Sequence, residues 1–542
     1  MRDEGVDDIF DYVIIGGGVA GCVLASRLSE DPGTRVLLLE AGGRDNSPLI
    51  AAPGGLLPIM MSGRHAWRYM SAPQRHLDGR MLYLPRGKVL GGGSSINGMV
   101  YDRGFHSDYD RWAQAGNSGW SFAEVLPYFR KLENFGPADD QWHGKNGPVA
   151  VTRAAQDHPF ARAFAAAGLE AGFPACDDLN GGAREGFGPV DLTVRNGRRV
   201  SASRAYLRPA LGRRNLVVRT GAQSRKLLFE GKRAVGVEFR HAGASYEALA
   251  RRETILAAGA IGSPHLLMLS GVGDAAALRA HGIVTIHNLP GVGQALQDHL
   301  AVTVKYVSTK PWSMLRYLNP LRGALAMAQY LAFRRGPLAD PGMSAACFLK
   351  SHPSLDEPDI KMLLVMALYS NNGRSLTPSH GFSAHINVAR PDARGTVTLA
   401  SADPDAMPII DQNYLGAERD RIAARAGVRL ARHIFAQAAF DPMRGEELSP
   451  GAEVQSDAEI DAFIRANAEA DYHSVGTARM GSDAMAVVDA TLRVHGIEDL
   501  RVVDASIMPH LPGGNTAIPV AMIAEKAADM IRGLPPLPAA EA

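Results

Sequence analysis

A glycine-rich turn between two apolar runs near the amino terminus constrains the fold more than any other stretch of the chain. The first run, 11–15, reads DYVII, and the second, 36–40, reads VLLLE and ends on an acid. Between them, glycines stand at positions 16, 18 and 21, and the apolar residues that follow have helical spacing. A strand, a tight turn, a helix and a second strand in this order are typical of a dinucleotide-binding unit.

Each of these positions has an expected role. Gly16 permits the tight turn, and Gly18 lets backbone amides approach a pyrophosphate. Gly21 lets the helix pack close to the strand, with the helix N-terminus facing the anion. Glu40 can accept hydrogen bonds from a ribose diol. The unit therefore predicts a bound dinucleotide, although it does not distinguish FAD from NAD.

The composition excludes several classes of function. Lys and Arg number 57 and Asp and Glu 56, so the net charge of +1 gives no large field to attract nucleic acid. Three distant cysteines favour neither a disulfide framework nor a metal site, and they fit a reducing compartment. The acidic start of the chain argues against a signal peptide, and no apolar run reaches transmembrane length. We therefore predict a cytoplasmic protein without a metal.

One apolar stretch bears on membranes. Residues 321–335 read LRGALAMAQYLAFRR, which predicts a mainly apolar helix with a basic end. A helix packed on the protein is the favoured interpretation, and a helix docked on a membrane surface is the alternative. Peripheral membrane contact thus stays open.

A second glycine-rich stretch spans residues 87–104 and reads GKVLGGGSSINGMVYDRG. Three adjacent glycines and two serines let backbone amides crowd a ligand without side chains in the way. The flanking Pro85 and Arg86 and the apolar Met99 and Val100 indicate an ordered, buried turn rather than a flexible loop. We expect this turn to contact the same ligand.

This stretch resembles, throughout its length, the first signature of the glucose–methanol–choline family of FAD-dependent oxidoreductases. Residues 259–273 resemble the second signature, and 290–299 and 395–404 also fit the family. The resemblance runs from Asp11 to about Arg532 and implies FAD as the cofactor. Some members attach the flavin covalently through a histidine in the first signature, but Ile96 stands at that position here. The resemblance therefore implies a non-covalent flavin.

The resemblance also implies cofactor contacts outside the first glycine turn. Asp504 and Ala505 resemble the second flavin contact, near the pyrophosphate and ribityl chain, although an Asp at a strand end could instead cap a helix. Ser224 is expected near the adenine and Arg86 near the pyrophosphate. The remaining cofactor-binding residues implied are Gly92, Ser94, Asn97, Gly98, Met99, Val100 and Thr516.

Residues 472–481, YHSVGTARMG, resemble the family's catalytic-histidine segment. The resemblance implies that His473 removes the hydroxyl proton of an alcohol while a hydride passes to flavin N5, and that Asn515 holds the oxygen. An imidazole, with an ordinary pKa near 6.5, suits this task. A helix beginning at Thr516 would stabilise negative charge near flavin N1 and O2. His299 and His510 match no catalytic position, and we expect both to be structural.

The fold class predicted is α/β: a Rossmann-like FAD-binding domain, discontinuous in sequence, and an α+β substrate domain with a mixed or antiparallel sheet. The runs 253–259 and 500–506 are expected to join the dinucleotide sheet, and 382–388 and 395–399 are strand candidates of the substrate side. We assign residues 1–155, 197–305 and 466–542 to the FAD-binding domain, and 156–196 and 306–465 to the substrate-binding domain. The end, 534–542, is expected to be a loose tail.

The function predicted is FAD-dependent oxidation of a CH–OH donor, a primary aliphatic or aryl alcohol, to the aldehyde. The similarity is to choline-dehydrogenase-like and alcohol-oxidising enzymes, and the electron acceptor is oxygen or a quinone. The alternative is a lyase or photodecarboxylase on the same fold, without net redox turnover. The sequence does not decide between dehydrogenase and oxidase, and it does not predict the oligomeric state.

Overall fold

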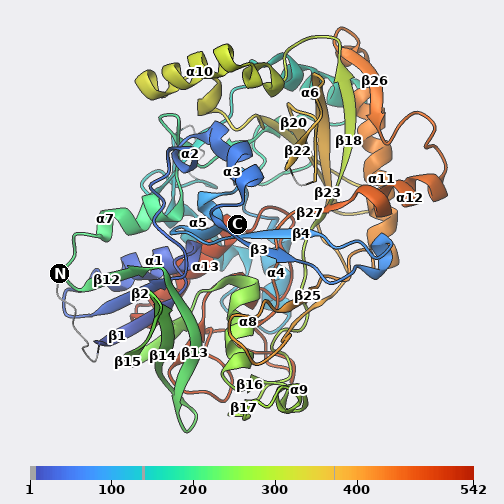
Figure 1. Ribbon diagram of the computed structural model, residues 1–542. Helices are drawn as coiled ribbons and strands as arrows, with labels where there is room; N and C mark the ends of the chain where they lie inside the picture. Colours follow the sequence, from blue (N-terminus) through green and yellow to red (C-terminus); the bar gives the residue numbers. More distant parts are fainter. Residues whose placement is uncertain (1–7, 137–140, 372, 542) are drawn as a thin grey trace.

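The computed structural model describes residues 8–136, 141–371 and 373–541 of the 542. Two large sheets organise these residues, and each sheet gathers strands from distant parts of the chain (Figure 1). The start of the chain, 1–7, on which the expectation about a signal peptide depends, lies outside the described residues. Among the described helices, none combines the length and the apolar character needed to cross a bilayer.

The first sheet contains seven described strands in the order β12-β2-β1-β15-β14-β13, with β28 beside β15. Four neighbouring pairs are parallel: β12–β2, β2–β1, β1–β15 and β15–β28. The pairs β15–β14 and β14–β13 are antiparallel. Its strands are β1 (Asp8–Ile15), β2 (Val36–Glu40), β12 (Leu216–Thr220), β13 (Ala222–Glu230), β14 (Arg233–His241), β15 (Ala244–Leu256) and β28 (Leu500–Val502).

The first glycine turn connects β1 to helix α1 (Val19–Leu28), as predicted. Strand β2 is buried along its whole length, which its continuous apolar run requires in a sheet covered on both faces. A Cβ on Gly21 would lie 1.9 Å from the carbonyl oxygen of Gly16, so only glycine allows α1 to pack this close to the turn. Helix α1 packs on β1 and β2 and against α13 (Ala517–Ile531), which begins one residue after the start predicted at Thr516.

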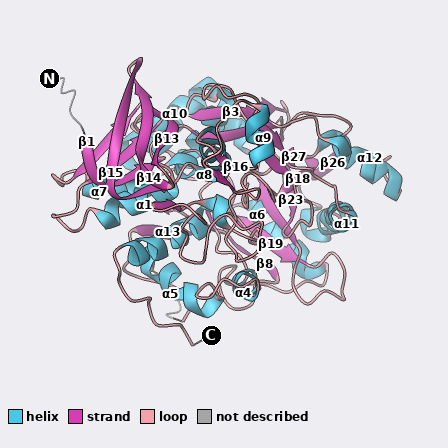
Figure 2. Cartoon of the chain, turned by 90° about the horizontal axis from the view of Figure 1, so that it is seen from below, coloured by secondary structure: helices cyan, strands magenta, loops and turns pink. Residues whose placement is uncertain are grey.

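The second sheet also contains seven described strands, in the order β26-β18-β23-β20-β19-β8, with β27 beside β18, and every pairing is antiparallel. Helices α6 (Pro159–Glu170) and α11 (Glu418–Phe435) contact each other and cover one face of it (Figure 2). Its strands are β8 (Gly186–Pro189), β18 (Leu300–Ser308), β19 (Ala345–Leu349), β20 (Ile360–Val365), β23 (Gly381–Val388), β26 (Arg444–Ser449) and β27 (Glu469–Ala470).

Three secondary-structure elements do not follow the expected domain limits. The limit at residue 305 falls inside β18, and the limit at 466 falls inside α12 (Asp457–Asn467). Strand β27, which lies in the segment assigned to the FAD-binding domain, pairs with β18 of the second sheet. The candidate strand 395–399 forms β24 (Thr396–Thr398), which pairs with β25 (Ile409–Asp411) outside both large sheets.

Two other expectations need correction. The end of the chain is not loose over its described part, because the backbone N–H of Leu537 donates to Tyr128 Oη at 3.2 Å and that of Ala540 to Ala123 O at 2.8 Å. Helix α10 (Pro320–Phe333) was expected to pack on the protein, yet it buries only two of its side chains. The α/β class itself, with an antiparallel second sheet, is confirmed.

Smaller elements complete the described chain. A four-stranded sheet, β5-β9-β7-β6, and the hairpin of β3 and β4 form separately from the two large sheets. These strands are β3 (Ala66–Met70), β4 (Tyr83–Gly87), β5 (Val100–Tyr101), β6 (Glu133–Phe135), β7 (Val149–Arg153) and β9 (Asp191–Leu192). The remaining described α-helices of four or more residues are α2 (Pro48–Ala51), α3 (Leu56–Ser62), α4 (His106–Gln114), α5 (Phe122–Leu132), α8 (Gly259–Leu269) and α9 (Ala275–Ala280).

Candidate functional site

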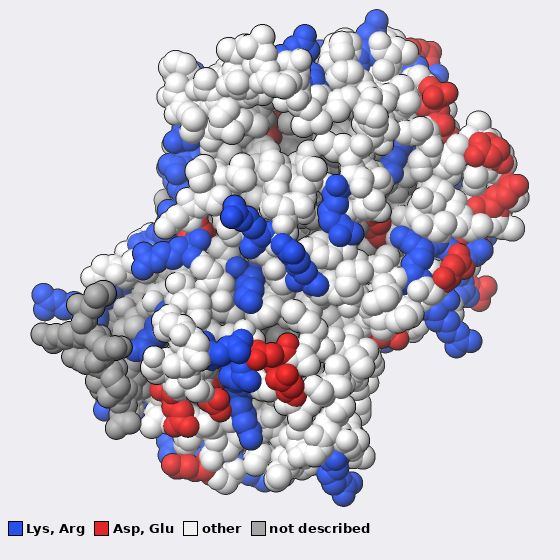
Figure 3. All heavy atoms as spheres, viewed as in Figure 1, with Lys and Arg blue, Asp and Glu red and all other residues white. Residues whose placement is uncertain are grey.

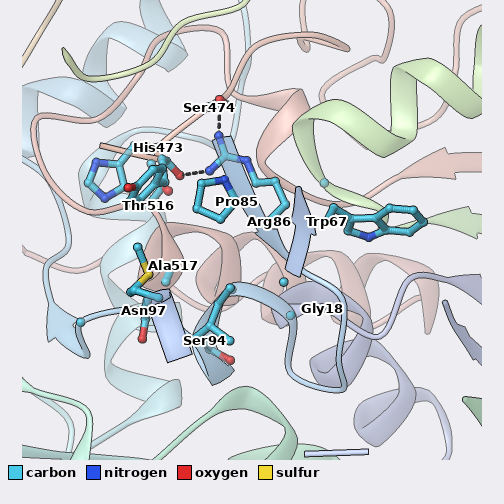
Figure 4. Close-up of a pocket in the computed structure, with 18 of the residues that line it drawn as sticks. Gly18, Trp67, Pro85, Arg86, Ser94, Asn97, His473, Ser474, Thr516 and Ala517 are labelled. Atoms are coloured by element: carbon cyan, nitrogen blue, oxygen red, sulfur yellow. Dashed lines mark hydrogen bonds between the residues drawn. The ribbon is translucent and has the colours of Figure 1, made fainter. Parts of the chain in front are cut away.

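A cavity of about 850 Å³ lies where the two sheets face each other, lined from both (Figure 4). It is lined by the ends of β1 and β2, the glycine-rich loop after β4, strands β20 and β23, and the start of α13. Of the residues predicted from the sequence, Gly21 alone does not line it. Those that do are Gly16, Gly18, Glu40, Arg86, Gly92, Ser94, Asn97, Gly98, Met99, Val100, Ser224, His473, Asp504, Ala505, Asn515 and Thr516.

The two glycine loops meet at one end of the cavity. A Cβ on Gly16 would lie 2.5 Å from the carbonyl oxygen of Ala257, and a Cβ on Gly92 would lie 2.7 Å from Gly18 Cα. By contrast, a Cβ on Gly18 would meet nothing nearer than Ala257 O at 3.8 Å. Gly16 and Gly92 are thus required by the protein's own packing, whereas Gly18 leaves open backbone toward the cavity, as a pyrophosphate site needs.

Two polar groups at this end fit a dinucleotide. The carboxylate of Glu40 accepts from the backbone N–H groups of Gly17 at 2.8 Å and Gly42 at 2.7 Å, and each oxygen keeps a lone pair for a ribose hydroxyl. Burial raises the pKa of this carboxyl. The hydroxyl of Ser224 is buried at the cavity wall without a hydrogen-bond partner among the described residues. A buried polar group of this kind calls for a partner, which the adenosine part of FAD can supply.

The second glycine loop is fixed by an arginine that the sequence did not single out. Arg199, buried on β11 (Arg198–Arg199), donates from Nη1 to the carbonyl oxygens of Ser94 at 3.2 Å and Asn97 at 2.6 Å. The same Nη1 donates to Asn97 Oδ1 at 2.8 Å. Met99 adopts a φ of 63°, in the left-handed region. The loop is therefore the ordered turn that was predicted, and its backbone conformation depends on a residue about a hundred positions away.

Two predicted cofactor contacts have other partners. Arg86 donates from Nη1 to the carbonyl oxygen of Tyr472 at 2.5 Å and from Nη2 to Ser474 Oγ, so its guanidinium holds the loop that carries the predicted base (Figure 4). Its contact with a pyrophosphate stays a prediction. Asp504 accepts from Gly259 N at 2.9 Å and Ser263 Oγ at 2.6 Å with one oxygen. Its other oxygen accepts from the backbone N–H and the hydroxyl of Ser506, which favours the capping role left open above.

The predicted catalytic pair does meet at the cavity. Asn515 Nδ2 lies 2.9 Å from His473 Nε2. His473 follows β27 on a loop in which Tyr472 adopts a φ of 66°, and Asn515 precedes α13. Thr516 and Ala517 line the cavity, and α13 begins without a side-chain cap. The free N–H groups of its first turn can therefore stabilise negative charge on a ligand.

A chain of hydrogen bonds fixes which nitrogen of His473 carries the proton. At one end, the ammonium of Lys361, which can only donate, lies 2.5 Å from Asn515 Oδ1 and 2.6 Å from Asp102 Oδ2. The Nδ2 group of Asn515 therefore faces His473 and donates to Nε2, which must be an acceptor. His473 Nε2 is thus an unprotonated acceptor at the cavity, where Asn515 occupies its lone pair.

The other end of the chain gives the same answer independently. His299 Nε2 lies 2.9 Å from the carbonyl oxygen of Ala389, which can only accept, so this nitrogen carries a proton. Burial lowers the pKa of His299, which keeps it neutral, and its Nδ1 is therefore an acceptor. His473 Nδ1 lies 2.9 Å from His299 Nδ1 and must donate to it. His299, expected to be purely structural, thus orients the candidate base, whereas His510 does not line the cavity.

Burial and charge set the protonation state of the site. Burial lowers the pKa of His473 to about 3, against the opposing effect of Asp471, whose Oδ2 lies 3.3 Å from Nδ1. Burial would raise the pKa of Asp471, but the neighbouring histidines, His473 and His385, hold it below its usual range. His385 Nε2 and Asn387 Nδ2 donate to this carboxylate at 3.0 and 2.6 Å. The site therefore holds a neutral imidazole beside an anionic carboxylate.

Sequence reasoning missed Lys361, His385 and Asn387, all on the second sheet. In β20 and β23, Lys361 pairs with Asn387 and Leu363 with His385, so these side chains share the cavity face. The alternation of polar residues in 382–388, FSAHINV, was the available signal. Ligand atoms of His299, Asp471 and His473 lie within 4.8 Å of one another, but the hydrogen bonds just described join these groups to each other.

Comparison with known proteins identifies the group to which this architecture belongs. Models of the N- and C-terminal parts of GMC oxidoreductases match residues 10–301 and 391–524. The chain is 48% identical over 530 residues to the oxygen-dependent choline dehydrogenase of Brucella anthropi, covering 97% of this chain and 96% of that protein. It is 46% identical over 539 residues to human mitochondrial choline dehydrogenase, covering 98% of this chain and 91% of that protein.

Solved structures of known enzymes resemble this chain over nearly its whole length. Pyridoxine 4-oxidase from Mesorbium loti superposes with a TM-score of 0.87 at 34% identity, over 96% of this chain and 98% of that one. A formate oxidase of Aspergillus oryzae, a protein with a modified FAD, superposes with a TM-score of 0.91 at 28% identity, over 98% and 99%. The chain therefore belongs to the GMC oxidoreductase family, and it is an FAD-dependent enzyme that oxidises an alcohol.

Proposed function

We propose that this enzyme oxidises a small primary alcohol, aliphatic or aryl, to the aldehyde, with His473 as the base. One observation carries the proposal: the fixed hydrogen-bond chain makes His473 Nε2, at the cavity, an unprotonated acceptor, which in this structure accepts from Asn515 Nδ2. FAD, held at the glycine loops when bound, supplies the hydride acceptor. Gly18, Glu40, Ser224 and the start of α13 are the groups that would hold it.

In this proposal, the substrate hydroxyl donates to His473 Nε2 in place of Asn515. Burial keeps the imidazole neutral, so Nε2 is unprotonated when the substrate binds. The carboxylate of Asp471 then provides a counter-charge 3.3 Å from Nδ1 as the imidazolium forms. Proton acceptance by His473 thus requires no other group to change its charge.

Asn515 has the complementary task of binding the substrate oxygen. Its Nδ2 group points into the cavity because Lys361 holds Oδ1, and the ammonium also polarises the amide. A donor fixed in this way stabilises an alkoxide more than it stabilises the neutral hydroxyl. Lys361 therefore acts through Asn515 as a positioning residue, anchored in turn by Asp102.

The substrate class follows from the cavity wall and from the relatives. Lys361, His385, Asn387 and Asp471 make the wall opposite the glycine loops polar, which suits a small polar alcohol. Because relatives with 46–48% identity are choline dehydrogenases, choline is the first alcohol to test. Asp471 is a carboxylate of the cavity wall that could face such a cation, and it already accepts from His385 and Asn387.

The experiment is anaerobic mixing of the purified holoenzyme with choline, with primary aliphatic alcohols and with benzyl alcohols. Bleaching of the flavin absorbance and formation of the aldehyde are expected for at least one of them. An oxidised flavin throughout the panel would contradict the proposal and return attention to the lyase and photodecarboxylase alternative, which the relatives do not support.

Three finer points belong to the same proposal. The flavin is non-covalent, because Ile96 at the cavity wall offers no nucleophile; acid precipitation should release the yellow colour into the supernatant.

The electron acceptor is oxygen or a quinone, which parallel assays with each would distinguish. A cytoplasmic location is supported by the three free, buried cysteines, whereas the human and mouse relatives are named as mitochondrial.

A further inference from the structure

Helix α10 directs its apolar side chains away from the molecule. Ala326 and Tyr330 are its buried residues, while Leu321, Leu325 and Phe333 are 70%, 62% and 71% exposed. A surface helix of a globular protein normally turns its polar side outward. The reverse orientation of α10 leaves an apolar surface that water does not favour, and such surfaces mark interaction sites.

The exposed face is continuous. Leu321, Leu325, Ala328 and Ala332 succeed one another at spacings of three and four residues, so they lie in one row along the helix. This row lies opposite Tyr330, whose hydroxyl donates to Ala51 O at 3.3 Å and anchors the helix on α2. The buried contact with the protein is therefore narrow, and the apolar row faces solvent along the whole length of α10.

The charged residues of the segment that carries this face all have one sign. Residues 310–339, which include η5 (Met314–Leu318) and α10, contain no acid. In Figure 3, the region that α10 occupies at the upper left of Figure 1 shows mostly uncoloured and blue spheres. The cationic residues of the segment are Lys310, Arg316, Arg322, Arg334 and Arg335. An apolar face bordered by cations is complementary to an anionic lipid surface, which offers acyl chains beneath negative headgroups.

Another side of α10, together with η5, reaches the rim of the cavity. Leu318 and Met327 are 54% and 39% exposed, and both also line the cavity. Met61 of α3, which is 53% exposed, lines it too. The rim of the cavity on this side is therefore apolar and adjoins α10.

We propose that η5 and α10 dock the enzyme on an anionic membrane surface, with the apolar row of α10 among the acyl chains and the basic side chains at the headgroups. Docking in this orientation turns the apolar rim of the cavity toward the bilayer. If the enzyme oxidises an alcohol as proposed above, a quinone dissolved in the bilayer can then approach the flavin site without crossing water.

Vesicle flotation tests the docking without reference to catalysis. The holoenzyme should float with vesicles that contain phosphatidylglycerol, and less with phosphatidylcholine alone or in high salt. The triple variant Leu321→Asp, Leu325→Asp and Phe333→Asp should bind at least about tenfold more weakly, since two leucines of the row and the exposed phenylalanine at the end of the helix become carboxylates. None of these three residues lines the cavity.

The matched control carries three Asp substitutions at similarly exposed apolar residues elsewhere, Leu169, Leu211 and Ile422, which are 56%, 49% and 53% exposed. It should float like the unmodified enzyme. Failure of the unmodified enzyme to float, or equal loss in both triple variants, would overturn the proposal. Sedimentation that shows a dimer dissociated only by the α10 variant, without vesicle binding, would assign the face to a second copy of the chain instead.

Flavin reduction separates this inference from the proposed function. Without vesicles, the α10 variant should reduce its flavin with alcohol at the unmodified rate, and turnover with a water-soluble quinone should not change. Turnover with a long-chain quinone embedded in anionic vesicles should fall with the binding. Flotation without any alcohol-driven flavin reduction would uphold docking and refute the proposed function; reduction without flotation would do the opposite.

Discussion

The two walls of the cavity are built in different ways. On the side of the first sheet, the wall is backbone: two glycine turns that touch each other, and the open first turn of α13. On the side of the second sheet, the wall consists of side chains, Lys361, His385 and Asn387, which alternate along antiparallel strands. The first wall suits an anion, which binds to amides that side chains would cover, and the second suits a neutral hydroxyl whose proton must move in one direction.

This difference has consequences for mutation. At the backbone wall, an added methyl group either strikes the protein itself or takes the space of the cofactor, so the effects should fall on folding and FAD affinity. At the side-chain wall, a truncated side chain leaves the strands paired, so the effects should fall on rate. This division would be wrong if substitutions at the backbone wall changed only the rate, and substitutions at the side-chain wall changed folding or FAD affinity.

The largest effect is expected for His473→Ala. Loss of the base should slow flavin reduction by roughly a hundredfold to ten-thousandfold, while the protein retains its FAD, because His473 belongs to the side-chain wall. Stopped-flow absorbance under anaerobic conditions measures the rate, and the yellow colour after gel filtration measures the cofactor. His510→Ala, outside the cavity lining, serves as the control and should change neither. Retained activity in His473→Ala would remove this residue from the mechanism.

Lys361→Met should have the next largest effect. The variant loses the donor that orients Asn515, a hydrogen bond to a charged group worth about 1.5–3 kcal/mol, so kcat should fall roughly tenfold to a hundredfold. Asp102 remains paired, because Arg184 Nη2 lies 2.6 Å from it. A positioning role predicts that kcat falls more than KM changes.

The matched control is Lys526→Met, which replaces another buried lysine, packed on Trp120 and Tyr128 away from the cavity. It should lower thermal stability without affecting kcat. An equal loss of kcat in both variants would indicate a general effect of removing a buried lysine rather than the orientation of Asn515.

A smaller effect, of a different kind, is expected at the backbone wall. Gly18→Ala should fold, because its Cβ meets only one atom, at 3.8 Å, but should weaken FAD binding about tenfold by covering open backbone. Gly16→Ala should fold poorly, since its Cβ would lie 2.5 Å from a carbonyl oxygen and its φ is +107°. FAD titration and thermal melts of the apoprotein separate these outcomes. Normal FAD affinity in Gly18→Ala would place the pyrophosphate elsewhere.

The two walls also differ in how far the sequence could predict them. The first glycine turn, both its strands and α13 were predicted because each is a local pattern, readable within about thirty residues. The roles of Lys361 and His299 could not be predicted in this way, because long-range strand pairing and loop packing bring them to His473. For Arg86 and Asp504, the segment was informative but the hydrogen-bond partner was not, since a partner is a property of the folded chain.

Helix α10 shows a third limit. Its composition predicted a helix, and 321–335 is close to the bounds observed, but apolar residues almost all around it left the buried side undetermined. The exposed side is set by Tyr330, through its contact with α2. The apolar pattern along one helix thus cannot show whether the helix packs on the protein or docks on a membrane, because both need the same apolar residues.

The pH dependence tests the side-chain wall most finely. Burial lowers the pKa of His473 to about 3, with Asp471 acting against it and His299, Lys361 and Arg86 lowering it further. A base with a lowered pKa stays unprotonated as the pH falls through the ordinary histidine range, about 6.5. The kcat/KM for an alcohol should therefore change less than about twofold between roughly pH 8 and pH 6, with its acid limb below that range. Asp471→Asn lacks the carboxylate that raises the pKa of His473, so the acid limb of its pH profile should move to still lower pH. A limb near the ordinary histidine pKa would mean that water reaches His473 in the working enzyme, and that the lone pair on Nε2 owes its availability to pH rather than to burial.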